Sequence, residues 1–308
     1  FLRTLKSEKG VQRRELKKEV ARILHKAKRN YSLALNEAKS TWKRTIRFKD
    51  IPLVIVIGNE GAGKSSLINY ANIEYPLSDK LESYKKIHKS TKNFNLYVSK
   101  KGALLDTEGN YFTQEDFFNP DTTDEIAEDD LEKNKDFLIK KAVWNKFLSF
   151  LNSSIFHSKL NGIVLVIDIH SFLNNPKQYS DNLIHFLVKR VHECEQNLNL
   201  KLPIYVVFSK LDLMEGMDIY WNVFNENVAN KILGITLEQQ ANKQTLLSYF
   251  QAISKSLLYS FMHKNKSLHS LDEKNRAFLF LKQLDTLFAL VVDFVIQVNE
   301  KNVLKNKS

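Results

Sequence analysis

Residues 58–65 read Gly58-Asn59-Glu60-Gly61-Ala62-Gly63-Lys64-Ser65, a complete G-x-x-x-x-G-K-S pattern. An apolar run from Ile51 to Ile57 precedes it, and a helical pattern begins at Ser66. In this setting the glycines are expected to turn successive backbone N–H groups toward one anion, and the following helix adds its partial positive charge. The stretch therefore indicates a site for a nucleoside phosphate.

Each residue type in this loop suits a role in binding a nucleotide. Lys64 is expected to reach the β- and γ-phosphates, and the Ser65 hydroxyl to ligate Mg²⁺. The backbone is expected to cradle the phosphates of GTP or GDP, or of ATP or ADP. The residues of this stretch predicted to contact the nucleotide are Gly58, Asn59, Glu60, Gly61, Ala62, Gly63, Lys64, Ser65 and Ser66.

Further metal ligands are expected at two places. Asp106 ends an apolar run 42 positions after Lys64 and opens a D-x-x-G pattern with Gly109. Asp106 is expected to hold Mg²⁺ through water, and the Gly109 N–H to meet a γ-phosphate. Thr91, in a Ser/Thr/Lys segment, is the candidate for a second hydroxyl ligand, and a solvated loop without a ligand fits that segment equally well.

The predicted catalytic residues are Lys64, Glu108 and Asn110. Asn110 follows the D-x-x-G pattern, where small GTPases place a glutamine that orients water. Glu108 lies two positions beyond Asp106 and shares its face in an extended segment, so we expect it to polarise the attacking water. The opposing interpretation, in which this carboxylate repels the γ-phosphate and hydrolysis is slow or absent, stays open.

A base-recognition pattern follows the apolar run 203–208. Ser209-Lys210-Leu211-Asp212 is an imperfect N-K-x-D. In that motif the aspartate accepts hydrogen bonds from a guanine edge and the lysine stem packs along the base. The asparagine ties this loop to the phosphate loop, which in this chain is residues 58–65. Lys210 and Asp212 are therefore candidate nucleotide contacts. Serine in place of asparagine leaves the choice between guanine and adenine open.

Strand and helix patterns alternate over residues 50–235, and only helical patterns follow in residues 236–308. Strands are predicted at 51–57, 95–99, 103–105, 162–168 and 204–208, and helices at 144–151, 181–196, 246–262 and 277–298. The alternation predicts an α/β fold of the P-loop NTPase type, similar to small GTPases, with a doubly wound, mainly parallel sheet and a C-terminal helical subdomain. Residues 115–136 hold ten Asp or Glu and two Lys, which indicates an exposed, mobile loop.

Residues 1–49 form a basic arm. They carry 16 Lys or Arg against 4 Asp or Glu, so the chain's net charge of +11 is concentrated here. Apolar residues recur every three or four positions from Leu16 to Ile46, which predicts a long amphipathic helix whose apolar stripe docks on the core. Nucleic acid, an anionic membrane surface and solvent each fit its charged face.

The composition excludes some classes of protein. A single cysteine, Cys194, allows no intrachain disulfide and fits a reducing compartment. No apolar run is long enough to span a bilayer. The chain begins at Phe1 without a secretory leader, so we expect a fragment of a longer protein.

Short segments spread over about residues 50–296 share one family pattern. They are Ile51-Pro52-Leu53, Tyr75-Pro76-Leu77, Thr91-Lys92-Asn93, Leu105-Asp106-Thr107 with Gly109, Tyr111 and Thr113-Gln114, Trp144-Asn145-Lys146-Phe147-Leu148, Asn161-Gly162-Ile163, Pro203-Ile204-Tyr205-Val206, Ser209-Lys210-Leu211-Asp212, Gly234-Ile235-Thr236, Phe278-Leu279-Phe280 and Lys282-Gln283-Leu284. With the phosphate loop, these segments resemble the cytoplasmic NTPase-like domain of the IcmF/TssM family, the large inner-membrane component of type VI secretion systems. Many relatives have alanine at the position of Glu108, arginine at that of Asn110 and threonine at that of Ser209.

The resemblance implies a location and partners. Family members carry this domain on the cytoplasmic face of the bacterial inner membrane, between membrane-spanning helices that would lie outside this stretch, and the basic arm would then be juxtamembrane. The implied partners are a TssL/DotU-like inner-membrane protein, a TssJ-like lipoprotein bound through the full-length protein, and baseplate components. The regular apolar stripe of the arm argues against a nucleic-acid partner.

Three functions stay open at this point. The first is a Mg²⁺-nucleotide-binding domain of the type VI membrane complex, with slow NTP hydrolysis or nucleotide-dependent switching that modulates contacts with its partners. The second is a catalytically idle adaptor with a relict or permanently occupied pocket. The third is a soluble ribosome-associated GTPase whose basic arm binds RNA, which fits the apolar stripe of that arm less well.

Overall fold

The computed structural model describes residues 2–42, 51–71, 73, 94–112, 135–152, 160–223, 234, 236–237, 242–264 and 270–305. The chain packs into two compact units. The first comprises Phe1–Ile167 and His185–Ser209, and the second comprises Asp168–Ile184 and Lys210–Ser308. Domain boundaries at residues 50 and 236 remain predictions. Thr91, the Tyr75-Pro76-Leu77 segment and residues 113–134, which include most of the expected acidic loop, lie outside the described residues.

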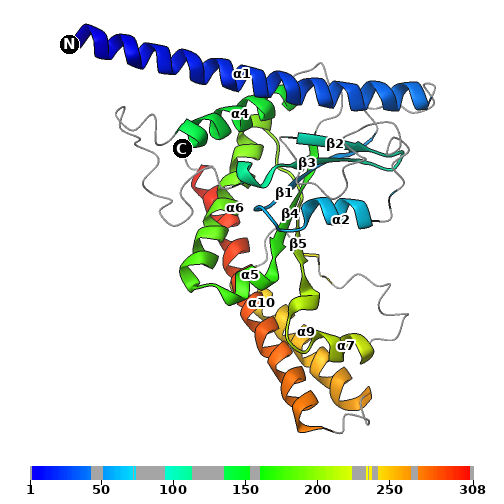
Figure 1. Ribbon diagram of the computed structural model, residues 1–308. Coiled ribbons are helices and arrows are strands. Elements are labelled where there is room, and N and C mark those ends of the chain that lie inside the picture. The colour runs from blue at the N-terminus through cyan, green and yellow to red at the C-terminus, as the bar shows by residue number, and fades with distance from the viewer. Residues whose placement is uncertain are drawn as a thin grey trace. The chain divides into compact units, whose positions relative to one another are not determined.

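The first unit is built on a five-stranded sheet in the order β2-β3-β1-β4-β5 (Figure 1). Its strands are β1 (Leu53–Ile57), β2 (Phe94–Val98), β3 (Ala103–Thr107), β4 (Leu160–Asp168) and β5 (Ile204–Ser209). β1 pairs in parallel with both β3 and β4, whereas β2 pairs antiparallel with β3. The expected α/β fold with a mainly parallel sheet is confirmed. The chain order reverses at β1, the strand that leads into the glycine-rich loop.

Burial explains why the central strands are almost continuously apolar. In β1, β2 and β3 the first and the last three residues are buried, as expected for strands covered on both faces. A tight turn joins β2 to β3, in which Ser99 Oγ accepts hydrogen bonds of 3.2 Å from the N–H groups of Lys101 and Gly102. This short turn lets β2 and β3, which follow one another in the chain, pair as neighbouring strands.

Helices α1 (Leu2–Thr41), α2 (Lys64–Tyr70), α4 (Lys135–Asn152) and most of α6 (Lys177–Leu198) belong to the first unit. The 40 residues of α1 span about 60 Å, and the helix packs against β2 and α4 (Figure 1). Its buried stripe is Val20, Ala27, Tyr31, Ala34, Leu35, Ala38 and Trp42. The ring of Tyr31 meets Phe147 and Phe150 edge-on. The predicted docking of the apolar stripe is confirmed, although the helix begins well before Leu16.

The second unit is helical in its described residues. It contains α5 (Ile169–Asn174), the first turns of α6, the short 3₁₀ helix η5 (Leu211–Leu213), α7 (Met217–Val223), α9 (Lys243–Lys264) and α10 (Leu271–Lys305). Helices α9 and α10 lie side by side around Leu246, Phe250 and Val292 (Figure 1), and Phe250 stacks on Phe288 with ring centroids 4.3 Å apart. The two helices expected after residue 236 are present. Throughout the described ranges, each helix is too short or too polar to cross a bilayer.

Candidate functional site

The loop after β1 has the backbone that an anion cradle requires. Gly61 and Gly63 have φ values of 75° and 84°, a left-handed conformation that costs other residues about 1–2 kcal/mol. At Gly58 the constraint is space, because an added Cβ would lie 2.4 Å from the carbonyl oxygen of Val166 in β4. The two glycines of the pattern, Gly58 and Gly63, and the additional Gly61 are therefore needed for the path of the backbone in this loop.

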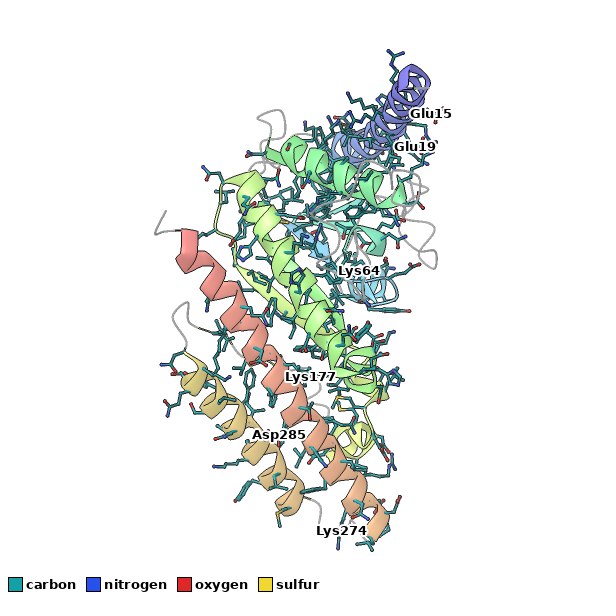
Figure 2. The ribbon with its side chains drawn as sticks, turned by 90° about the vertical axis from the view of Figure 1, so that its left-hand side faces the viewer. Glu15, Glu19, Lys64, Lys177, Lys274 and Asp285 are labelled. Carbon is teal, nitrogen blue, oxygen red and sulfur yellow. The ribbon has the colours of Figure 1, made fainter. Side chains whose placement is uncertain are left out.

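Lys64 holds its ammonium group over this loop. Its Nζ donates hydrogen bonds of 2.8 Å and 2.9 Å to the carbonyl oxygens of Gly58 and Asn59, and Figure 2 labels the residue at the start of α2. Burial lowers the pKa of Lys64, while the charges of Asp106, Glu60 and Glu108 act in the opposite direction. The loop therefore contains a buried cation, which suits an anionic ligand.

Ser65 and Asp106, both predicted metal ligands, are in direct contact. The Ser65 hydroxyl donates a 2.8 Å hydrogen bond to Asp106 Oδ2, and Asp106 is fully buried near the end of β3. Hydroxyl and carboxylate oxygens are ligands that Mg²⁺ accepts. No group of three or more His, Cys, Asp or Glu side chains gathers in the described residues. These two side chains therefore fit a magnesium ion whose other ligands are phosphate and water.

The D-x-x-G segment touches the phosphate loop at Gly109. A Cβ on Gly109 would lie 2.5 Å from both the N and the Cα atoms of Glu60. Only glycine permits this approach of two backbones. Gly109 is the first residue of the 3₁₀ helix η2 (Gly109–Tyr111). The ring of Tyr111 stacks on that of Phe94, with ring centroids 4.8 Å apart, and this contact holds the helix in place. Two motifs separated in sequence thus meet in the first unit.

The predicted catalytic residues Glu108 and Asn110 lie together. Asn110 Nδ2 donates a 3.2 Å hydrogen bond to Glu108 Oε1, and both side chains are half-buried. Burial and the negative charge of Glu108 raise the pKa of the Tyr111 hydroxyl. The geometry brings these two residues to the end of β3 beside Asp106, and their catalytic roles remain predictions.

Ser209, at the end of β5, is tied to the phosphate loop. Its hydroxyl donates a 2.7 Å hydrogen bond to the carbonyl oxygen of Ala62, and the carbonyl oxygen of Ile167 lies 3.2 Å from the same Oγ. Serine thus makes the link expected of asparagine in N-K-x-D. The carbonyl of Ala62 and the N–H of Gly63 point in opposite directions across one planar peptide, so this hydrogen bond also orients a loop N–H.

In the second unit, Lys210 pairs with a residue that the sequence did not single out. Its Nζ lies 2.6 Å from Oδ2 of Asp168, while Asp212 is exposed in η5. Ser66, in α2, is exposed as well. The position of Asp168 offered a signal, because it ends a buried strand, and ligands of α/β proteins bind at the carboxyl ends of strands.

A family model supplies the relationship of the chain to known proteins. The model of the IcmF-related N-terminal domain matches residues 139–308, which is more than half of the chain. The chain belongs to the IcmF/TssM family. This match begins beyond the phosphate loop, so membership of the IcmF/TssM family and the loop geometry are separate observations.

A curated relative agrees with the IcmF/TssM assignment. The type VI secretion system component TssM1 of Pseudomonas aeruginosa is 23% identical over 203 residues, which cover 66% of this chain and 17% of TssM1. The chain therefore spans about a sixth of the length of that relative.

Proposed function

We propose that this IcmF/TssM domain binds a Mg²⁺-nucleotide and that the bound nucleotide modulates contacts within a type VI secretion membrane complex. One observation carries the proposal. Within the first unit, the Ser65 hydroxyl of the glycine-rich loop lies 2.8 Å from Oδ2 of Asp106, which comes from a separate motif on the neighbouring strand. The reversal of strand order at β1 supports the same site, because ligands of open α/β sheets bind at such switch points.

Each group of the chain has a task in this proposal. The N–H groups of the glycine-rich loop bind phosphate oxygens, and the Lys64 ammonium, held beside the carbonyl oxygen of Gly58, balances their charge. Ser65 and Asp106 hold the metal from α2 and β3. When bound, Mg²⁺ supplies charge neutralisation for the phosphate groups.

Any hydrolysis is slow in this proposal. Glu108 stands in the position from which a carboxylate could orient water, but its Oε1 accepts a hydrogen bond from Asn110. An anionic group there also opposes the approach of a phosphate. We therefore favour binding and switching over fast turnover, with GTP or ATP as the triphosphate.

The relative supports a proposal for the place in the cell. TssM1 is a type VI secretion system component. We infer from this kinship that the present domain serves on the cytoplasmic face of the inner membrane, with a TssL/DotU-like protein, a TssJ-like lipoprotein and baseplate components as partners of the full-length protein.

A catalytically idle adaptor is the second candidate, and the second unit offers an observation for it. Large apolar side chains lie exposed on α9 and α10; they include Tyr259, Met262, Leu271 and Phe278, each at least 63% exposed. Exposed apolar residues that form one contiguous patch are typical of surfaces that dock other proteins, and the adaptor alternative requires these side chains to form such a patch. In this alternative the phosphate loop has no role in turnover or switching.

Nucleotide binding by the purified chain tests the proposal. We expect fluorescent mant-GTP or mant-ATP to bind the wild type with Mg²⁺, and Lys64→Ala to weaken that binding at least about tenfold, because a charge-assisted contact is lost. Lys101→Ala, which removes an exposed lysine from the turn between β2 and β3, is the matched control. If the wild type binds neither probe, the proposal of nucleotide binding fails and the catalytically idle adaptor remains as the candidate function. Single-turnover assays then measure hydrolysis.

A further inference from the structure

We propose that the exposed side of α1 is a docking surface for a membrane that carries anionic phospholipids. The inference concerns the first unit alone and does not depend on nucleotide binding. The apolar stripe of α1 is already occupied, because Ala27, Tyr31 and Ala38 are buried where the helix packs on β2 and α4. The opposite side of the helix is therefore the side that it offers to a partner.

That opposite side carries a line of basic side chains. Each residue advances about 100° round a helix, so residues two positions apart lie on opposite sides. Lys18 and Arg22 are each two positions from the buried Val20, and Arg29 is two positions from the buried Ala27. Steps of three or four positions join the exposed residues of this line, which extends over about 22 Å of the helix. We call it the basic row, and its members are Arg14, Lys18, Arg22, His25 and Arg29.

Acidic side chains of the helix do not cancel the charge of the basic row. Arg22 Nε donates a 2.9 Å hydrogen bond to Glu19 Oε2, so these two groups neutralise each other. Glu15, labelled with Glu19 in Figure 2, is exposed near the start of the row, and the exposed Lys17 and Lys26 outweigh it. The row therefore keeps a net positive charge over its whole length.

A bilayer surface fits the basic row better than a nucleic acid does. Figure 1 shows α1 as a straight helix, so cations along one side can meet many phosphates of a flat, anionic headgroup layer. Proteins bind single-stranded nucleic acid by stacking bases on aromatic rings, but between residues 13 and 42 both such side chains, Tyr31 and Trp42, are buried. Because the apolar stripe is also buried, the helix binds by charge and without insertion into the bilayer.

Sedimentation of the full chain with lipid vesicles tests the inference. We expect the protein to bind vesicles of equal parts phosphatidylcholine and phosphatidylglycerol and to ignore vesicles of phosphatidylcholine alone. Added salt should weaken the binding, because exposed charges are screened. The triple variant Arg14→Gln, Lys18→Gln and Arg29→Gln should lose affinity for the anionic vesicles at least about thirtyfold. Glutamine has a helix propensity close to that of lysine and arginine, so α1 should stay intact.

A second triple variant is the matched control. It removes the same charge from exposed lysines on other parts of the first unit. Its effect on vesicle affinity should stay below about threefold, because these lysines lie outside the basic row and solvent screens them. The control substitutions are Lys101→Gln, Lys146→Gln and Lys201→Gln.

Several results would overturn the inference. They are no binding to anionic vesicles, equal binding to both kinds of vesicle, binding that salt does not weaken, and equal losses in the two triple variants. Tighter binding of the wild type to a labelled RNA or DNA duplex than to anionic vesicles, at one salt concentration, would assign the basic row to nucleic acid instead. Both triple variants should bind mant-nucleotides as the wild type does, so this inference and the proposed nucleotide site fail independently.

Discussion

The Ser65 hydroxyl donates a 2.8 Å hydrogen bond to Oδ2 of Asp106, across 41 positions of sequence. Ser65 is in the first turn of α2, and Asp106 is in β3, which pairs in parallel with β1. The hydrogen-bonded sheet thus places the end of β3 next to the loop that follows β1. The contact joins two motifs, one predicted to bind phosphate and the other predicted to bind a metal.

Asp106→Asn should remove the dependence of nucleotide binding on Mg²⁺. A neutral amide is a poorer ligand for a hard cation than a carboxylate. We expect EDTA to weaken mant-GDP or mant-ADP binding to the wild type at least about tenfold, as loss of a charged contact does, and to change binding to the variant little. Asp136→Asn, an exposed carboxylate of α4, is the control. A variant as sensitive to EDTA as the wild type would exclude Asp106 from the metal site.

Gly109→Ala should destabilise the first unit and weaken nucleotide binding. The new methyl would meet the backbone of Glu60 at 2.5 Å, so one segment must move, at a cost of about 1–3 kcal/mol. The matched control is Gly102→Ala, whose Cβ would lie 3.6 Å from the nearest atom, the carbonyl oxygen of Pro52. Urea unfolding of both variants checks the difference. Equal stability of the two would mean that the D-x-x-G segment does not press on the phosphate loop.

Asp168 should stabilise the fold in a pH-dependent way. Burial disfavours its ionised form, but hydrogen bonds from Lys210 and Ser171 outweigh burial and lower the pKa of Asp168 below its usual 3.8. The unfolded chain therefore binds more protons than the folded one between the two pKa values, so the stabilising contribution is present above pH 3.8 and lost as the pH falls through the folded-state pKa.

The corresponding measurement is the difference in free energy of unfolding between wild type and Asp168→Asn. We expect this difference to be constant near neutral pH and to shrink on acidification below pH 3.8. Urea titrations at a series of pH values provide it. A difference that grows on acidification would contradict the ion pair between Asp168 and Lys210.

Glu193→Ala should be strongly destabilising. Arg190 is fully buried in α6, and its Nη1 lies 2.7 Å from Glu193 Oε2, which also accepts a 2.8 Å hydrogen bond from Trp144 Nε1. Burial raises the pKa of Glu193, while Arg190 and Trp144 oppose that shift. Removing one partner of a buried ion pair costs about 3–5 kcal/mol, whereas an apolar replacement of both is often tolerated.

The double variant Arg190→Met with Glu193→Leu, which replaces both partners by apolar side chains, should therefore be compared with Glu193→Ala. It should recover most of the stability that Glu193→Ala loses, as judged by thermal or urea unfolding. If the double variant is no more stable than Glu193→Ala, the buried ion pair would be a net stabilising contact in this protein.

Ala38→Glu should detach α1 from the first unit. Ala38 is completely buried on the docking stripe, and an unpaired carboxylate there would cost several kcal/mol, on the order of 3–5. Asn36→Glu adds the same side chain on the exposed face of the helix. Limited proteolysis within residues 2–42 should separate the two variants. Equal protection of both would show that α1 is not held by this stripe.

Local patterns made the phosphate loop predictable. One short stretch contains its glycines, Lys64 and the flanking strand and helix. The features that predict this loop are therefore all near neighbours in the sequence. The family resemblance, confirmed by the match over residues 139–308, was drawn from short segments spread along the chain. It required no knowledge of where those segments lie in space. The nucleotide, the metal and the catalytic roles were predicted on the same grounds and remain predictions.

The remaining features depend on contacts that no local pattern encodes. Ser209 and Ala62 are 147 positions apart, and Lys210 and Asp168 are 42 apart, so their pairing follows only from the order of the strands. Helices α5 and α7 were not predicted, since six or seven residues make fewer than two turns and give little periodicity. Thr91 lies outside the described residues, and its role remains a prediction.

The packing of α1 has a consequence for solubility. β2 is the terminal strand of the described sheet, and α1 lies against it. A terminal strand with unsatisfied backbone groups is a template for joining a second molecule, and proteins commonly shield it with a helix. Deletion of residues 1–42 should therefore yield a protein that aggregates through β2. The basic helix would then protect the protein against aggregation, independently of any ligand of its charged face.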